Sequence, residues 1–412
     1  MRFLLAVLLS FLPISASRPV VAQQSPAVLL LDATALLDAQ NAARAGDPHI
    51  QAALNELRKQ ADRALTRGPY TVTQKSVPPP SGDVHDYTSL SIYWWPDASS
   101  PTGLPYVLQD GVRNPEVDDA TRFDLGTALR MVDDVESLSL AYFLTGDERY
   151  AEHAADLLRA CFLSPATRMN PNLQYSEMIP GRDVVRGTGI IEGRVFTRTI
   201  DSIALLAGCP CWTADDQQGM RQWFADLGQW MRTSPNGQKE SAAANNHAVW
   251  YDVQLTDFAL FTGDSGTARQ VAQAALGARI DTQIAADGSL PHEIARTRSL
   301  HYSDFDLQAF AELATLSRLV GVDLWGGMPI QVPRPSGGIR AALDFLLPYW
   351  MSPDSWPYRE ITNVDVLHEN GQTLRTAAAA YSDNDYVAAL SQLSSNQTAL
   401  DLLRLNLGYW PT

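Results

Sequence analysis

The sequence predicts an all-α protein, an α/α toroid in which an incomplete barrel of helical hairpins carries long aromatic loops over a cleft. Apolar residues recur at helical spacing through most of the chain, as in Leu54, Leu57 and Ala61. Strand-like alternation of apolar and polar residues is scarce. Thr-Gly-Asp occurs at residues 145–147 and again at 262–264, each time between two helical stripes, which indicates repeated helix–turn–helix units. Such hairpins either stack as a solenoid or close into a toroid.

Helix-capping residues and apolar residues at helical spacing predict the positions of two neighbouring helices. One helix is expected over roughly residues 134–144, because Gly146 can end it in a left-handed conformation. Asp147 is then expected to cap a helix that runs to about Leu158.

Later helices and the loops follow from the same signals. A helix is predicted over residues 213–231, and Ser303 is predicted to open another helix as a capping box with Asp306. Long loops within a compact domain tend to be functional, and we expect residues 67–120 to form a small aromatic lid. Three such loops, all rich in aromatic residues, are predicted at 67–130, 164–198 and 285–303.

Composition excludes several classes of protein. The 412 residues are 45% hydrophobic and 19% charged, so a large core can form and an intrinsically disordered chain is excluded. The formal net charge of −15 argues against a nucleic-acid binder and against a protein of basic membrane surfaces.

The first residues are typical of an export signal. A short positive start precedes an apolar run over residues 3–12. The Val-Val-Ala sequence that ends at Ala22 favours cleavage there, and residues 15–17 offer a second site. We therefore expect a signal peptide over residues 1–22, a single toroid domain over residues 23–412, and a periplasmic or secreted mature protein.

Three cysteines leave the disulfide pattern open. An oxidising compartment allows one bond, and Cys161 paired with Cys209 or Cys211 competes with three buried thiols. The Cys-Pro-Cys segment is not a CxxC redox motif, and two cysteines without a nearby histidine make a poor zinc site.

Two of the long loops carry side chains that suit a carbohydrate. In the first loop, Tyr93, Trp94 and Trp95 can pack on the apolar faces of sugar rings, with packing of the loop on itself as the alternative. The second loop gathers amides and arginines that suit recognition of hydroxyls and carboxylates, with a solvated surface loop as the alternative. Its candidates are Asn172, Gln174, Tyr175, Arg182, Arg186 and Arg194.

Two further segments hold groups that could do chemistry. An Asn-Asn-His run at residues 245–247 leads into a helix that contains Trp250. Farther on, residues 296–302 place a phenol near a guanidinium whether the backbone is extended or helical. A nearby arginine lowers the pKa of a tyrosine, as a tyrosine base needs. A structural histidine and a surface salt-bridge patch are the alternatives.

Taken together, these segments resemble the alginate-lyase-type polysaccharide lyases of α/α toroid fold, over about residues 85–360, and they are most similar to the glucuronan-lyase branch. The resemblance implies β-elimination in a β-1,4-linked polyuronate, with glucuronan favoured over polymannuronate or alginate, and 4,5-unsaturated uronate ends as products. The segments that carry it are Tyr-Trp-Trp-Pro at 93–96, Met-Asn-Pro-Asn-Leu-Gln-Tyr at 169–175, Asn-Asn-His-Ala-Val-Trp-Tyr-Asp at 245–252, and the run from His292 to Leu307.

The same resemblance implies roles for individual residues. Tyr302 would act as base and acid, and Asn246 and Arg296 would neutralise the uronate carboxylate. His247 would either neutralise the carboxylate or share the role of base. No metal and no cofactor is implied, the partner is an acidic polysaccharide rather than nucleic acid or membrane, and we expect a monomer. The remaining residues expected to bind substrate are Tyr93, Trp94, Trp95, Asn172, Gln174, Tyr175, Arg182, Arg186, Asn245, Trp250, Arg298 and His301.

Two rival functions stay open. The sequence also leaves open whether the enzyme cleaves within the polymer or from its end. A non-catalytic periplasmic polysaccharide-binding protein is one rival, although such proteins are usually α/β and this chain shows no βαβ alternation. The other is a toroidal glycoside hydrolase acting on uronate oligosaccharides, which needs two carboxylates beside the bond. Four carboxylates are available for that role: Asp183, Glu192, Glu293 and Asp304.

Overall fold

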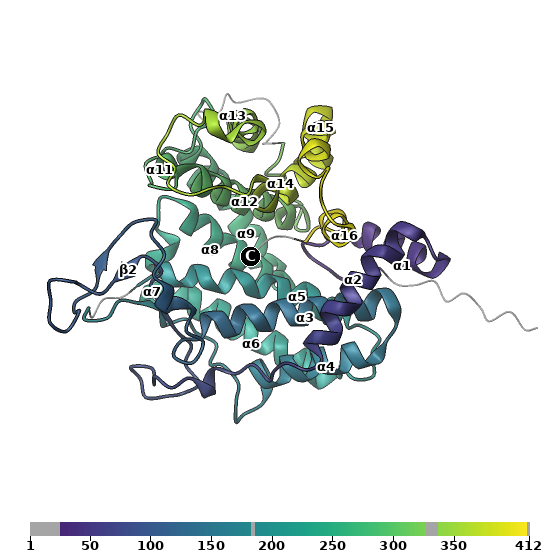
Figure 1. Ribbon diagram of the computed structural model, residues 1–412, viewed down its shortest axis with the longest axis horizontal. Helices are drawn as coiled ribbons and strands as arrows, with labels where there is room; N and C mark the ends of the chain where they lie inside the picture. Colours follow the sequence, from purple (N-terminus) through teal and green to yellow (C-terminus); the bar gives the residue numbers. More distant parts are fainter. Residues whose placement is uncertain (1–24, 183–185, 327–336, 410–412) are drawn as a thin grey trace, which may run out of the picture.

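A computed structural model describes residues 25–182, 186–326 and 337–409, and helices dominate these residues (Figure 1). The predicted all-α class is thereby confirmed, whereas the expected signal peptide at residues 1–22 lies outside the described residues. The longer helices are α1 (Ala33–Ala45), α2 (Pro48–Ala64), α3 (Leu125–Thr145), α4 (Glu148–Leu158), α5 (Phe196–Leu205), α6 (Ala214–Thr233), α8 (Asn246–Thr262), α9 (Ser265–Ala275), α12 (Ser299–Arg318), α13 (Gly338–Met351), α14 (Val366–Tyr381), α15 (Asn384–Leu393) and α16 (Ala399–Leu407). The short ones are α7 (Pro235–Ser241), α10 (Asp281–Gln283) and α11 (Pro291–Ile294).

Helix α8 is central to the fold, because helices pack against it on opposite sides. Its side chains face two hydrophobic cores. Tyr251 and Phe258 belong to a core shared with α2 to α6, while Val249 and Val253 belong to a core shared with α12, α13 and α14. Figure 1 shows α3, α5, α6 and α8 side by side, with α12 and α14 above them. A helix buried on every side cannot show a narrow apolar stripe, and α8 is apolar around most of its circumference.

The two Thr-Gly-Asp joints are helix turns, as predicted. Gly146 follows α3 and Gly263 follows α8, each in a left-handed conformation with φ of 74° and 87°. Glycine adopts this conformation without the steric penalty that a Cβ brings. Asp147 and Asp264 then cap α4 and α9 by accepting a hydrogen bond from a backbone N–H of the first turn.

Two helix predictions are wrong at their starts. Helix α3 begins at Leu125 rather than near residue 134. Helix α12 begins at Ser299, so Ser303 lies inside it, and its hydroxyl donates to the carbonyl of Ser299 over 2.8 Å instead of capping a helix. A serine followed three residues later by an acid occurs inside helices too, and only the backbone separates the two cases.

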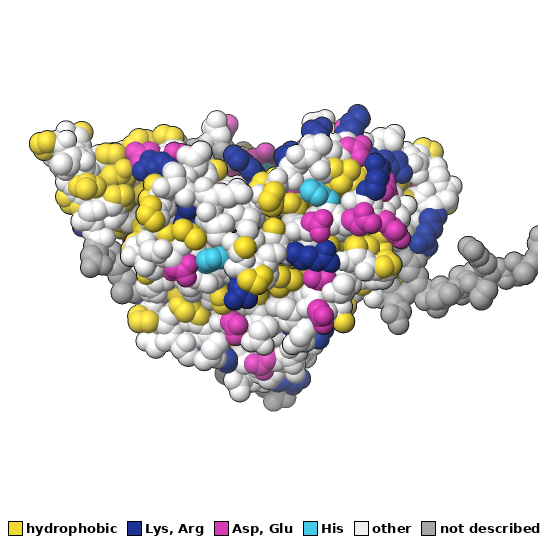
Figure 2. All heavy atoms as spheres, turned by 90° about the horizontal axis from the view of Figure 1, so that it is seen from below, with side chains coloured by type: hydrophobic (Ala, Val, Ile, Leu, Met, Phe, Trp, Pro, Cys, Tyr) yellow, Lys and Arg dark blue, Asp and Glu magenta, His cyan; other side chains and the backbone are white. Residues whose placement is uncertain are grey.

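The first long loop folds into two short β pairings. Strand β1 (Thr88–Leu90) runs parallel to β4 (Tyr175–Met178) in the second long loop, with Thr88 opposite Tyr175. Strand β2 (Trp94–Trp95) pairs antiparallel with β3 (Val107–Leu108), with Trp94 opposite Leu108. The β2–β3 hairpin projects at the left of Figure 1 and belongs to the segment predicted as a lid. Figure 2 shows hydrophobic side chains gathered at this end, and Leu104, Leu108 and Val112 are exposed there.

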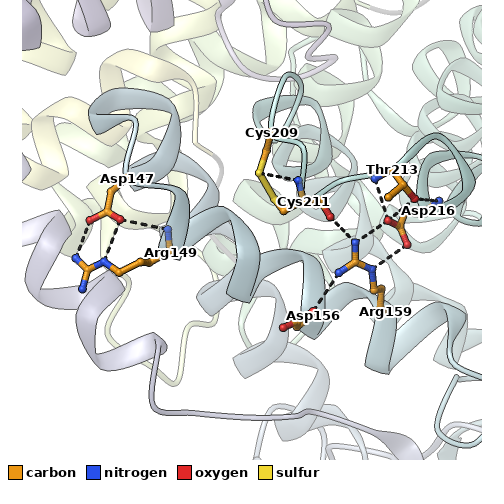
Figure 3. The surroundings of a disulfide bond; sticks show 8 residues. All are labelled: Asp147, Arg149, Asp156, Arg159, Cys209, Cys211, Thr213 and Asp216. Atoms are coloured by element: carbon orange, nitrogen blue, oxygen red, sulfur yellow. Dashed lines mark hydrogen bonds and ion pairs between the residues drawn. A yellow bond between two sulfur atoms is a disulfide. The ribbon is translucent and has the colours of Figure 1, made fainter.

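The disulfide differs from the expected pairing. Cys209 and Cys211 are joined to each other, with their Cα atoms 5.1 Å apart, and Cys161 is a buried free thiol (Figure 3). Both alternatives left open by the sequence, a bond to Cys161 and three free thiols, are wrong, because Cys209 takes Cys211 as its partner. The turn that holds the disulfide is anchored by Arg159, which donates to the carbonyl of Cys211 and to Asp216.

The described residues contain neither a candidate membrane-spanning helix nor a candidate metal site. No helix among them is both long and apolar enough to cross a bilayer. Within the same ranges, no three His, Cys, Asp or Glu side chains are grouped so that they could hold a metal ion.

Candidate active site

A cleft of about 1020 Å³ opens where the loops meet the starts of α8 and α12. The long loops supply one wall, and the first turns of these two helices supply the other. Ten of the residues singled out from the sequence line it, namely Tyr93, Trp94, Arg186, Asn245, Asn246, His247, Arg296, Arg298, His301 and Tyr302.

Six residues expected to bind substrate do not line the cleft. Trp250 is 2% exposed and packs in the core, because it faces inward from α8. The Nε1 of Trp95 donates to the carbonyl of Val112, so that side chain fastens the hairpin. The guanidinium of Arg182 lies 4.8 Å from the ring centroid of Trp94 in the same hairpin. The others are Asn172, Gln174 and Tyr175, which belong to the turn that leads into β4.

The N-terminus of α8 places Asn246 and His247 at the cleft. The backbone N–H and the Nδ2 of Asn246 both donate to Oε1 of Glu293 over 2.8 Å. The Nδ1 of His247 lies 2.7 Å from Oε1 of Glu240, which is 2% exposed. The positive end of a helix dipole favours a negative charge nearby. This end of the cleft therefore suits a bound carboxylate.

Glu240 controls the charge of His247. Burial alone would lower the pKa of His247, but the neighbouring Glu240 carboxylate outweighs that effect and raises the pKa above its usual value. The contact with Glu240 also fixes a proton on Nδ1, so Nε2 is the atom left for a substrate.

Tyr302 lies in the first turn of α12, between two arginines of the preceding loop. The guanidinium of Arg296 is 4.0 Å from the centroid of the Tyr302 ring. The Tyr302 hydroxyl donates to the hydroxyl of Tyr93 over 2.6 Å, and Nη1 of Arg298 donates to the same Tyr93 oxygen over 3.3 Å. The predicted neighbourhood of phenol and guanidinium is therefore present.

The predicted direction of the Tyr302 pKa is wrong for the protein without substrate. Burial raises the pKa of Tyr302 well above its usual value, the contact with Tyr93 adds to the rise, and Arg296 and Arg298 offset only part of it. Tyr302 is 8% exposed, so the loss of hydration around a phenolate exceeds the attraction of the two cations. In this state Tyr302 holds its proton.

The chain's own carboxylates hold two of the site's arginines in place. Asp110 accepts from Arg296 over 2.7 Å and from Thr297 over 2.9 Å. Gly111, at φ of 79°, allows this approach because a Cβ there would collide with Thr297. Glu177 accepts from Arg186 over 2.8 Å. Sequence reasoning missed Asp110, Glu177 and Glu240, because nothing in their spacing connects them with the arginines and the histidine that they contact.

The carboxylates considered for a hydrolase are not arranged as a pair across the cleft. Asp183 lies outside the described residues. Glu293 accepts hydrogen bonds from Asn246, and Asp304 accepts one from Nε1 of Trp350 over 2.7 Å. Of these four, Glu192 is the one that lines the cleft within the described ranges, where it accepts from Ser89 over 2.5 Å. Burial raises the pKa of Glu192 to about 8. The geometry therefore does not favour two-carboxylate hydrolysis.

Comparisons with known proteins agree with this site. The alginate lyase family model matches residues 71–356, which is most of the chain. The chain belongs to the alginate lyase family. A crystal structure of an alginate lyase from Bacteroides ovatus has 36% sequence identity and a TM-score of 0.87, over 93% of this chain and 99% of that one. This lyase is therefore an enzyme that acts on polysaccharide, and the predicted toroid fold is confirmed.

More distant structures share the fold. Alginate lyase A1-III from Sphingomonas species A1 has 17% identity and a TM-score of 0.55, over 96% of this chain and 100% of that one. A histidine-to-alanine variant of alginate lyase A1-III, complexed with a tetrasaccharide, has 17% identity and a TM-score of 0.56, over 94% and 98% of the two chains. No curated protein matches this lyase.

Proposed function

We propose that this lyase cleaves β-1,4-linked polyuronate by β-elimination in the cleft described above, and leaves 4,5-unsaturated uronate ends. The observation that carries the proposal is the convergence of Tyr302, His247, Asn246 and Arg296 on one cleft from two separate parts of the chain. A phenol that can move a proton then stands beside groups that can stabilise a carboxylate.

The first task is to make the C5 proton of the uronate acidic. The neighbouring carboxylate opposes loss of that proton while it carries a full negative charge. His247 and Arg296 supply positive charge, and Asn246 together with the N-terminus of α8 supplies dipoles at the same place. We assign His247 to neutralisation of the carboxylate, because Glu240 raises its pKa and so favours the imidazolium.

The second task is proton transfer at C5 and O4. We assign both transfers to Tyr302. Its phenolate takes the proton from C5, the electron pair of that bond forms the C4–C5 double bond, and the C4–O4 bond breaks. Tyr302 then returns the proton to O4. In β-linked glucuronate and mannuronate, H5 and O4 leave from the same side of the ring, so one tyrosine can reach both.

Tyr302 must lose its hydroxyl proton before it can act as the base. Its hydroxyl donates to Tyr93, which provides a path for the proton, and Arg296 above the ring favours the anion. Binding of substrate closes the cleft to water, which strengthens every electrostatic contact inside it. No step requires a metal or cofactor.

The substrate is proposed as glucuronan first and polymannuronate or alginate next. The sequence resemblance favours glucuronan, while the similar solved structures are described as alginate lyases. The two sugars differ at C2, away from the bond that breaks, so the same side chains can act on both. We also propose that residues 1–22 direct export and that the enzyme acts as a monomer in the periplasm or outside the cell.

One assay tests the proposal and ranks the substrates. Mature protein is incubated with glucuronan, polymannuronate, polyguluronate and hyaluronan, and ultraviolet absorbance of the new double bond is followed. We expect unsaturated product from glucuronan or polymannuronate and none when Tyr302→Phe replaces the wild type. Shorter chains without ultraviolet absorbance would instead support a hydrolase, and no cleavage of any polymer would support a binding protein.

A further inference from the structure

Arg194 is a cation in the cleft that the proposed elimination does not use. It belongs to the 3-10 helix η4 (Thr188–Val195) and lines the cleft wall. Its guanidinium lies over two aromatic rings, 5.2 Å from the centroid of Phe305 and 5.7 Å from that of Trp250. In the part of the chain that the structure describes, its side chain has no hydrogen-bond acceptor and no ion-pair partner.

Arg186 and Arg296 of the cleft are each paired with an acid, whereas Arg298 donates to the hydroxyls of Thr362 and Tyr93. Arg186 is 2.8 Å from Glu177, and Arg296 is 2.7 Å from Asp110. These contacts fix the position of each guanidinium and offset part of its charge. Arg194 contacts ring faces instead, which hold a guanidinium in place but leave its N–H groups free to donate.

Among the described residues, neither of the carboxyl groups that act on the charge of Arg194 forms an ion pair with it. Glu192 and Glu312 are the acids that act on its charge. Burial raises the pKa of each of them to about 8, so both carry a proton at neutral pH. Gln308 donates to Glu312 over 3.0 Å, and Ser89 donates to Glu192, which further occupies their oxygens. Arg194 therefore presents an uncompensated positive charge to the cleft.

A half-buried cation without an ion-pair partner is costly to a fold, so its presence calls for a ligand. The proposed substrate carries a carboxylate on every sugar unit, and a guanidinium binds a carboxylate through two parallel hydrogen bonds. The carboxylate of the reacting unit already has partners in His247, Asn246 and Arg296. A second uronate unit is the group left to supply an anion.

We propose that Arg194 binds the carboxylate of a uronate unit other than the one that undergoes elimination, so that the cleft recognises at least two charged sugar units. The inference rests on the proposed function, because it takes a polyuronate as the ligand. Phe305 would at the same time offer an apolar surface beside that unit, since its ring stacks on His301 at an interplanar angle of 6°.

Binding measured apart from turnover tests the proposal. The parent is Tyr302→Phe, and the probes are saturated tetramers of β-1,4-glucuronate and of β-1,4-mannuronate, titrated by calorimetry. Adding Arg194→Gln should weaken binding of whichever tetramer the parent binds more tightly. The expected loss is about 10- to 100-fold, as for loss of a charge-assisted hydrogen bond. The weakening should shrink at high salt. Arg340→Gln is the matched control, because that guanidinium lies 5.1 Å from the Tyr381 ring, away from the cleft, and should leave binding unchanged.

Steady-state kinetics separate this role from catalysis. In the otherwise wild-type enzyme, Arg194→Gln should raise KM for the polymer and leave kcat within about threefold, because the contact forms equally in the ground state and the transition state. Arg194→Lys keeps the charge but cannot form the bidentate hydrogen bonds of a guanidinium. Its KM should therefore lie between that of the wild type and that of Arg194→Gln. A fall in kcat at unchanged KM would overturn the proposal.

Thermal stability separates this role from a structural one. Because Arg194 has no counter-ion in the free protein, Arg194→Gln should leave the Tm unchanged or raise it, whereas loss of a structural contact would lower it. Equal tetramer binding by Tyr302→Phe with and without Arg194→Gln would also overturn the inference. If the wild type instead released no unsaturated product from any polymer, the proposed function itself would fail, and the two failures are thus distinguishable.

Discussion

The hydroxyl of Tyr302 donates to the hydroxyl of Tyr93 over 2.6 Å, although 209 positions separate the two residues in the chain. The contact joins the first aromatic loop to the start of α12. The phenol that we assign to proton transfer is 8% exposed, and both tyrosines line the cleft. Both the position and the protonation of Tyr302 therefore depend on a residue that the sequence leaves far away.

Tyr302→Phe should abolish most of the turnover without unfolding the protein. The variant keeps the ring under Arg296 but removes the group that moves the proton, and general acid–base catalysis is typically worth about 10²- to 10⁴-fold. We expect at least that loss in kcat, with nearly unchanged Tm and tetramer binding. Tyr386→Phe is the matched control, because its hydroxyl donates to Asp344 over 2.6 Å away from the cleft. Retention of more than about a tenth of the wild-type kcat would contradict the assignment.

Glu240→Gln should move the alkaline side of the pH–rate profile to lower pH. Glutamine keeps a polar atom beside Nδ1 of His247 but removes the negative charge that raises the pKa of that histidine. If the imidazolium neutralises the substrate carboxylate, activity disappears as pH rises through the pKa of His247, and the variant reaches that point sooner. The measurement is kcat/KM from pH 5 to pH 10. A shift of the acidic side of the profile to lower pH, with the alkaline side unchanged, would instead indicate that neutral His247 is required, as for a base.

The same pair makes a pH-dependent contribution to folding. Because the pKa of His247 is raised in the folded state, the stabilisation is fully present below the pKa of an unfolded histidine, about 6.5, and is lost as pH rises through the folded value. Chemical unfolding of wild type and Glu240→Gln at pH 6 and pH 9 should therefore differ more at pH 6.

Glu192→Gln should stabilise the protein at alkaline pH. Burial raises the pKa of Glu192 from its usual 4.5 to about 8, so between these values the unfolded chain loses a proton that the folded protein retains. The wild type therefore becomes less stable as pH rises through this window, by on the order of a few kcal/mol for this group. Glutamine has no proton to lose. The Tm of the variant should equal that of the wild type near pH 5 and exceed it at pH 9, as measured by calorimetry.

Peptide mapping should find Cys209 bonded to Cys211 and Cys161 free. Cys161 is buried, and burial raises the pKa of its thiol to about 12, so it should resist alkylation in the folded protein and react after unfolding. Mass spectrometry of non-reduced digests, with and without denaturant during alkylation, gives the answer. A peptide that links Cys161 to either partner would contradict the structure.

The helical part of the fold was predictable because its signals are local. A helix repeats every 3.6 residues, and the Thr-Gly-Asp joints hold the end of one helix and the cap of the next within three positions. The starts of α3 and α12 were not predictable to the same degree, and at α12 a tertiary contact helps to hold the first turn. Glu360, for example, accepts from the backbone N–H of Leu300 at the start of α12.

The candidate site was predictable in its residue types but not in its arrangement. The Asn-Asn-His run and the Arg-Thr-Arg to Tyr302 segment could be identified because each is contiguous. Trp250 and Arg182 were expected to bind substrate but do not line the cleft, since a sequence does not say which side of a helix or hairpin faces a cleft. Trp250 packs in the hydrophobic core, and the guanidinium of Arg182 lies over the ring of Trp94.

By itself, the sequence determined the helical class, the turns between hairpins and the four side chains that converge on the cleft, all of which follow from neighbours along the chain. Only the tertiary structure decided which carboxylate neighbours each cation, and through that the charge of the site. His247 is held by Glu240 and Arg296 by Asp110, while Arg194 has no ion-pair partner among the described residues. Electrostatic interactions depend on distance and burial in space, so these properties appear only once the chain has folded.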